Sequence, residues 1–134
     1  MRLPPRISRW VKWLEDPKNK QCQRTLFRGQ KRCCLGGACN VFMEDNGGKL
    51  RKFRGDSDFL FADGTDELTE ELPKTIAKWF GINTIPKLRV PPSLLLKAEG
   101  NKSKWATNLN DTYDFTFAEI AQCIRYTYKM KKAK

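Results

Sequence analysis

Histidine is absent from the 134 residues of the chain. This absence excludes Ser-His-Asp triads, Cys-His dyads and histidine-ligated metal sites, and it removes the commonest general base near neutral pH. We therefore expect a non-enzymatic protein that binds a partner and uses no cofactor.

Long hydrophobic runs are also absent. The longest apolar stretches, such as Leu94–Leu96, are far too short to cross a bilayer. The segment Met1–Arg9 holds three arginines but no apolar core of the kind that a signal peptide needs. We therefore expect no membrane partner, and the odd number of cysteines favours free thiols in a reducing cytoplasm.

The few cysteines are spaced in a way that does not suit zinc. Structural zinc sites combine two close pairs of ligands, whereas here Cys34 and Cys39 form one such pair and no second pair follows. We predict buried structural thiols and no metal site. A redox or nucleophilic role for Cys34 stays open, because a helix N-terminus lowers the pKa of a thiol. The five cysteines are Cys22, Cys33, Cys34, Cys39 and Cys123.

Positive charge, in contrast, is plentiful, with 26 Lys and Arg against 15 Asp and Glu and a net charge of +11. Residues 1–55 have a net charge of +10, residues 56–114 of −3 and residues 115–134 of +4. The two ends are therefore expected to contact an anionic macromolecule, with a simple solubility role as the alternative. The expected contacts are Arg6, Arg9, Arg24, Arg28, Lys31, Arg32, Arg51, Lys52, Arg54, Lys129, Lys131 and Lys132.

Apolar residues repeat at helical spacing in several segments, as in Ile7, Trp10, Val11 and Leu14. A capping box from Thr116 to Glu119 marks the start of the last such segment. The predicted helices cover residues 6–16, 35–46, 73–80 and 116–128.

Strand signals are shorter. A hairpin is predicted from residues 25–27 and 31–33 around Gly29, and two further strands from residues 50–54 and 59–61. Several prolines make residues 82–105 mostly extended or irregular. The prediction is an α+β fold: a single small domain over residues 1–128, with about four helices and a small antiparallel sheet or hairpins, and a basic tail over residues 129–134.

Two glycines in Leu35-Gly36-Gly37 lie at an expected helix start. Backbone N–H groups at such a start bind phosphate, but the Lys-Ser/Thr of a P-loop and the spacing of a dinucleotide fingerprint are both missing. An anion site and close helix packing are therefore equal alternatives.

Carboxylate pairs and tryptophans offer two further possibilities. Asp63 with Asp66, and Asp111 with Asp114, would suit Mg²⁺, although turn and capping roles explain them more simply. The four tryptophans would stack bases next to Lys and Arg. Three of them lie at or beside helix stripes, so core packing is favoured. The tryptophans are Trp10, Trp13, Trp79 and Trp105.

Several blocks together resemble a family of small proteins common in tailed-bacteriophage genomes. In that family, a helix of the type W-x-x-A-L is followed along the chain by three further blocks. These are C-C-L-G-V-L-C-D, L-P-x-x-V-x-x-W-L-G-L and L-N-D-x-G-x-S-F-x-x-I-A. Here Gly37 replaces the usual Val, Asn40 replaces Asp and Tyr113 replaces Gly, and one extra residue precedes Thr116. The matching blocks are Trp10–Leu14, Gln23 with Leu26, Cys33–Asn40, Leu72–Gly81, Leu109–Asp111 and Phe115–Ala121.

The resemblance implies phage origin and an accessory role in the host cytoplasm, and it gives no reaction. The first hypothesis is a non-enzymatic accessory protein that binds an anionic partner, either nucleic acid or a host protein. Alternatives are an anti-defence sponge that sequesters a host nucleotide signal, a small virion component, and a small hydrolase or thiol enzyme. For the sponge, the expected ligand-binding residues are Gln23, Cys34, Gly36, Gly37, Asn40, Asn110 and Asp111.

Overall fold

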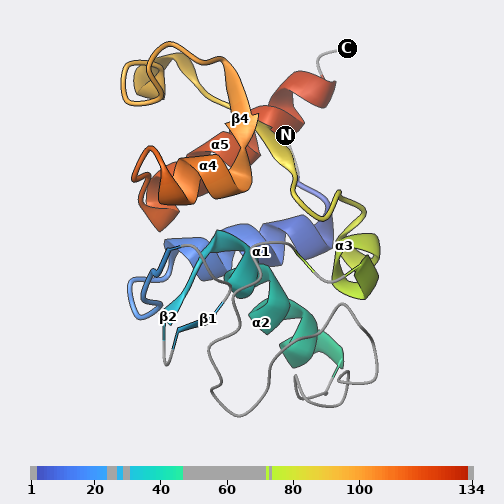
Figure 1. Ribbon diagram of the computed structural model, residues 1–134. Helices are drawn as coiled ribbons and strands as arrows, with labels where there is room; N and C mark the ends of the chain where they lie inside the picture. The colour runs from blue at the N-terminus through green and yellow to red at the C-terminus, as the bar shows by residue number, and fades with distance from the viewer. Residues whose placement is uncertain (1–2, 24–26, 29–30, 47–71, 73, 133–134) are drawn as a thin grey trace.

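The computed structural model describes residues 3–23, 27–28, 31–46, 72 and 74–132. These ranges contain helices and two pairs of short antiparallel strands (Figure 1). In chain order the elements are α1 (Pro5–Glu15), β1 (Phe27–Arg28), β2 (Lys31–Arg32), α2 (Cys34–Asn46), α3 (Lys74–Phe80), β3 (Lys87–Arg89), a 3₁₀ helix (Pro92–Leu94), β4 (Ser103–Trp105), α4 (Ala106–Asp111) and α5 (Phe117–Lys132).

Helix α1 lies at the centre of the fold, between α2 on one side and α5 on the other (Figure 1). Its predicted apolar stripe of Ile7, Trp10, Val11 and Leu14 is buried. The indole N–H of Trp10 donates a hydrogen bond of 2.9 Å to the carbonyl of Cys34, which joins the middle of α1 to the first residue of α2. The spacing in the sequence therefore predicted both the helix and its buried face.

The predicted hairpin around Gly29 is confirmed by β1 and β2. The two strands pair antiparallel, with Phe27 opposite Arg32 and Arg28 opposite Lys31. An isolated parallel bridge between Gln21 and Arg32 attaches the segment after α1 to the hairpin.

Residues 82–105 are more regular than the sequence indicated. Strands β3 and β4 pair antiparallel, with Lys87 opposite Trp105 and Arg89 opposite Ser103. Helix α4 follows β4 directly and buries Ala106 and Leu109. These three-residue strands and the six-residue helix are too short to produce a detectable period, which is why the sequence predicted about four α-helices whereas the described residues form five.

Helix α5 begins with the predicted capping box. The backbone N–H of Thr116 donates to Glu119 Oε1 at 2.9 Å, and the backbone N–H of Glu119 donates to Thr116 Oγ1 at 3.1 Å. The helix runs to Lys132, past the start of the predicted basic tail at residue 129. Lys129 and Lys131 therefore lie on the last turns of a helix that is anchored at its start.

The predicted α+β class and single small domain are confirmed. The two strands predicted over residues 50–54 and 59–61 lie outside the described residues. Among the helices that are described, none is long and apolar enough to cross a membrane.

Candidate functional site

The side chain of Asn110, which is 1% exposed, holds three segments of the chain together. Its Oδ1 accepts hydrogen bonds from Gln21 Nε2 at 2.8 Å and from the backbone N–H of Cys34 at 3.2 Å. Its Nδ2 donates to the carbonyl of Cys22 at 2.9 Å and to Asp111 Oδ1 at 2.7 Å. An amide group offers two donors and an acceptor with two lone pairs, so every position on this side chain is occupied by the protein itself.

Gln23 extends this network toward the surface. Its Nε2 donates to the carbonyl of Asn110 at 3.1 Å and to Asp114 Oδ1 at 2.8 Å. Gln21 Nε2 also donates to the carbonyl of Phe115 at 2.8 Å. We call this network the Asn110 junction, defined by Gln21, Cys22, Gln23, Cys34, Asn110, Asp111 and Asp114.

Gly36 and Gly37 are in close contact with protein atoms at the start of α2. A Cβ atom added at Gly37 would lie 2.4 Å from a ring carbon of Trp13, so this glycine allows the indole of α1 to lie against the backbone of α2. The backbone N–H of Gly36 donates to Cys33 Sγ at 3.4 Å. Of the two alternatives for these glycines, close packing therefore has direct support at Gly37, and the N–H group of Gly36 already has an acceptor within the protein.

All five cysteines are buried free thiols. Burial raises the pKa of Cys33 to about 12, and it also raises the pKa values of Cys34 and Cys39. The expectation that the start of α2 would lower the pKa of Cys34 is therefore wrong, because desolvation outweighs the helix dipole. Within the described ranges, no group of three or more Cys, Asp or Glu side chains is arranged to hold a metal ion.

Two of the predicted anion contacts bind groups on other helices. Arg6 Nη1 donates to the carbonyl of Trp79 at 2.6 Å, and its guanidinium lies over the Trp79 ring, 4.3 Å from the centroid. Arg9 forms ion pairs with Glu44, at 3.1 Å, and with Asp45. Both arginines connect α1 to neighbouring helices. Part of the positive charge of the N-terminal segment therefore interacts with groups of the protein itself.

Arg32 is also engaged within the protein, because its Nε donates to Asn40 Oδ1 at 2.9 Å. Partial burial lowers the pKa of its guanidinium. Lys31, Lys129 and Lys131 are exposed. The side chains of the other predicted contacts lie outside the described residues: Arg24, Arg28, Arg51, Lys52, Arg54 and Lys132.

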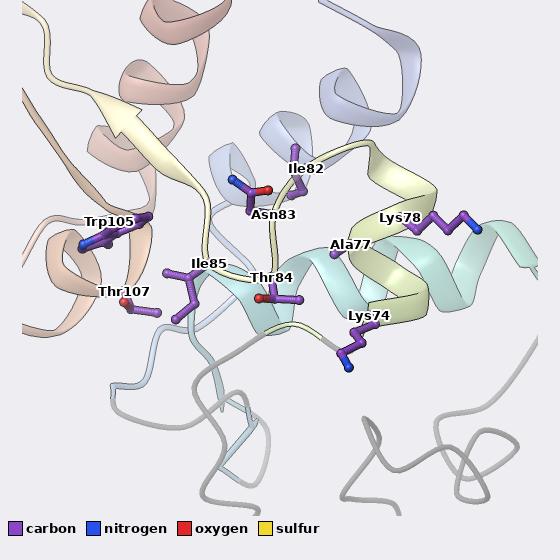
Figure 2. Close-up of a pocket in the computed structure, with 9 residues that line it drawn as sticks. All are labelled: Lys74, Ala77, Lys78, Ile82, Asn83, Thr84, Ile85, Trp105 and Thr107. Atoms are coloured by element: carbon purple, nitrogen blue, oxygen red, sulfur yellow. The ribbon is translucent and has the colours of Figure 1, made fainter.

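A cavity of about 750 Å³ opens between α3 and the end of β4. Figure 2 shows Trp105 and Thr107 on one side of it and the α3 residues Lys74, Ala77 and Lys78 on the other, with residues 82–85 between them. This volume lies within the range of small-molecule binding sites, which is roughly 300–1,000 Å³. The described lining residues are Lys74, Ala77, Lys78, Ile82, Asn83, Thr84, Ile85, Trp105 and Thr107.

Trp105 is the aromatic side chain of this cavity and is 46% exposed, whereas Trp10 is 1% exposed. The backbone of Trp105 is fixed by the β3–β4 pairing with Lys87 and by the hydrogen bond of 2.8 Å that the N–H of Ala106 donates to the carbonyl of Pro86. The ammonium of Lys87 lies over the indole, 5.3 Å from the ring centroid. Core packing therefore explains Trp10, while Trp105 has the exposure that base stacking requires and a cationic neighbour that would add to it.

A second cavity of about 260 Å³ adjoins the first, and the two share Ile82 and Asn83. Lys87, Tyr128 and Lys131 line it, and the ammonium of Lys131 lies 5.0 Å from the centroid of the Tyr128 ring. None of the described residues that line either cavity is acidic. We call the continuous surface the lysine–tryptophan surface, defined by Lys74, Lys78, Lys87, Trp105, Tyr128 and Lys131.

Three lysines of this surface are available for an external anion. Within the described part of the chain, Lys78, Lys87 and Lys131 have no carboxylate at ion-pair distance, and all three side chains are exposed. Uncompensated lysines that surround a cavity raise the local positive potential and attract anions.

Sequence reasoning placed one residue of this surface, Lys131, among the anion contacts and missed the other lysines. The segment 56–114 has a net charge of −3 because seven of its ten acidic residues lie between positions 56 and 71. The remainder differs, since residues 72–105 contain seven Lys or Arg and a single acidic residue, Glu99. A shorter window for the charge count would have detected this basic stretch.

The chain belongs to the family described as Domain of unknown function (DUF8296), which matches residues 5–128. The match covers the whole Asn110 junction and the lysine–tryptophan surface up to Tyr128, and it ends before Lys131. No curated protein and no solved structure matches the chain.

Proposed function

We propose that this member of the DUF8296 family is a non-enzymatic protein that binds nucleic acid through the lysine–tryptophan surface. The observation that carries the proposal is a cavity with an exposed tryptophan and lysines at its rim, with no acidic side chain among the described lining residues. Phosphate contacts by Lys supply most of the affinity in sequence-independent nucleic-acid binding. Aromatic side chains add stacking that tolerates any base.

The resemblance to small tailed-phage proteins adds to the proposal that the protein acts in the cytoplasm of an infected host. An accessory protein that acts on nucleic acid in the host cytoplasm needs no catalytic group, which agrees with the absence of histidine. The nucleotide-sponge alternative receives less support, because Gln23, Cys34 and Asn110 bind protein groups in the junction. An acidic host protein is the remaining anionic partner.

The test is fluorescence anisotropy with a labelled oligothymidine of about 16 nucleotides, between about 50 and 200 mM salt. We expect the logarithm of the binding constant to fall linearly with the logarithm of the salt concentration, because bound lysines release counterions from the phosphates. Absence of binding at the lowest salt concentration would refute nucleic-acid binding and leave the acidic host protein as the candidate.

Charge-reversal variants locate the surface. Lys78→Glu with Lys87→Glu removes two lysines of the lysine–tryptophan surface, and we expect at least a tenfold weaker affinity. The matched control is Lys12→Glu with Lys18→Glu, since both lysines are exposed and neither lines a described cavity. The two double variants have the same net charge, so an equal loss in both would show that overall charge, rather than this surface, drives binding.

A further inference from the structure

We infer that the cavity between α3 and β4 holds an unpaired nucleobase stacked on Trp105, so that the protein prefers single-stranded nucleic acid to duplex. This inference rests on the proposed nucleic-acid function and specifies the form of nucleic acid that the site takes. Three features of the site carry it: the access to the indole, the polar groups around the cavity, and the path that the second cavity offers to the next nucleotide.

The first feature is the access to Trp105. Its indole lines a concave site of about 750 Å³ and is 46% exposed. An aromatic side chain stacks on the face of a base, and in a duplex the neighbouring base pairs cover both faces. Only a base that has left the stack, or was never in one, therefore has a face free to stack on the indole.

The second feature is the polar groups around the cavity. Asn83 is exposed and Thr107 is half-buried, and they belong to different segments of the chain that meet at this cavity (Figure 2). An amide group both donates and accepts hydrogen bonds, as does a hydroxyl group. These groups match the donors and acceptors on the edge of an unpaired base, which in a duplex are already bonded to the partner base.

The third feature is continuity of the surface. Lys87 lies over the indole of Trp105 and also lines the second cavity with Lys131. A nucleotide whose base stacks on Trp105 would therefore have an ammonium close to its phosphate. The next nucleotide along the strand would follow the shared residues Ile82 and Asn83 toward Lys131.

The segment between the cavities is held in place before any ligand arrives. The backbone N–H of Ile82 donates to the carbonyl of Ala77 at 3.0 Å, and the N–H of Leu72 donates to the carbonyl of Thr84 at 2.9 Å. Gly81 ends α3 with a φ of +76°, a conformation that glycine adopts without strain. A preformed site spends less conformational entropy on binding, so a single stacked base contributes more to the affinity.

The experiment compares four ligands of equal length: oligothymidine, oligouridine, an abasic sugar-phosphate strand and a blunt duplex. We expect the wild-type protein to bind the first two at least tenfold more tightly than the last two. A difference between oligothymidine and oligouridine would show whether DNA or RNA fits the site better. Equal affinity for all four ligands would overturn the inference while leaving the proposed nucleic-acid function intact, and no binding to any ligand would overturn both.

Variants of Trp105 supply the second readout. We expect Trp105→Ala to lose at least tenfold in affinity for oligothymidine and less than threefold for the duplex, whereas Trp105→Phe retains most of the single-strand affinity because a ring remains. Circular dichroism and thermal unfolding verify that both variants are folded. Lys87→Glu is the matched control, since it should weaken single-strand and duplex binding alike. A loss for Trp105→Ala that is the same for both ligands would contradict base stacking.

Discussion

In the Asn110 junction, polar side chains from distant segments are hydrogen-bonded to one another around an amide that is 1% exposed. On the lysine–tryptophan surface, cations and an indole face solvent around two cavities. Polar groups that are hydrogen-bonded within the fold stabilise it, but they have few donors or acceptors free for a ligand. Exposed groups contribute little to stability and are available for binding. The two regions therefore separate the stability of this protein from its proposed function.

The largest effect on stability is expected from Asn110→Ala. The change removes the buried hydrogen bonds of Asn110, including those to the N–H of Cys34 and the carbonyl of Cys22, and a buried donor left unsatisfied costs roughly 1–3 kcal/mol. We expect a loss of about 3 kcal/mol or more in the free energy of unfolding, measured by urea denaturation. Asn108→Ala is the control on the same helix, because the Asn108 side chain has no hydrogen bond within the described residues, and it should cost less than about 1 kcal/mol. Similar losses in both variants would mean that the junction is not a centre of stability.

A smaller loss is expected from Gly37→Ala, which places a methyl group against the ring of Trp13. Overpacking of this kind costs about 2 kcal/mol, which outweighs the helix propensity gained by alanine. Thermal and urea unfolding measure the change. In a double-mutant cycle with Trp13→Leu, the second substitution should recover part of the loss, because it removes the clashing ring. Strict additivity of the two substitutions would show that the contact does not explain the glycine.

The capping box of α5 should contribute about 1 kcal/mol and give a pH dependence. Partial burial raises the pKa of Glu119, but the hydrogen bonds from Lys97 and Thr116 together lower it by more than burial raises it. The net shift of the pKa is therefore downward from 4.5. A carboxyl group whose pKa is lower in the folded state stabilises the fold at pH values above its unfolded-state pKa. This contribution is lost as the pH falls through the folded-state pKa. Glu119→Gln should therefore be less stable than the wild type at neutral pH, with the difference shrinking below about pH 4.5. A difference that grows in acid would contradict this sign.

The smallest effect on stability is expected on the lysine–tryptophan surface. Lys78→Ala removes an exposed side chain without an ion pair in the described structure, so the free energy of unfolding should change by less than about 0.5 kcal/mol. The same variant should weaken oligonucleotide binding. The slope of the logarithm of the binding constant against the logarithm of the salt concentration should become shallower by the amount that one phosphate contact contributes. A variant that loses stability and binding together would break the separation between the two regions.

The elements that the sequence predicted correctly are those in which a local signal repeats. The stripe on α1 spans about two turns, the capping box of Thr116 and Glu119 has a fixed spacing, and strands β1 and β2 pair closely along the chain. Helix α4 escaped prediction because six residues give less than two turns. Its position depends on tertiary contacts of Ala106 and Leu109 that no local pattern shows.

The candidate site was less predictable than the fold. Asn110 and Gln23 were singled out from a resemblance, and the structure brings them together, but as partners of each other in a network. Trp105 and Lys87 lie 18 residues apart and become neighbours only when β3 pairs with β4. The basic charge of residues 72–105 was hidden by averaging with the acidic residues that precede it. Pairing between distant segments therefore created the surface that composition could not locate.

Helix α4 begins immediately after Trp105 and ends at Asn110 and Asp111. With a rise of about 1.5 Å per residue, the five steps from Trp105 to Asn110 correspond to roughly 8 Å along the helix axis. The backbone at Trp105 thus lies between two fixed points: the β3–β4 pairing on one side and a helix whose far end carries Asn110 on the other. A strand that binds only the folded chain would therefore raise the free energy of unfolding of the whole domain by mass action, even though the two regions share no residue.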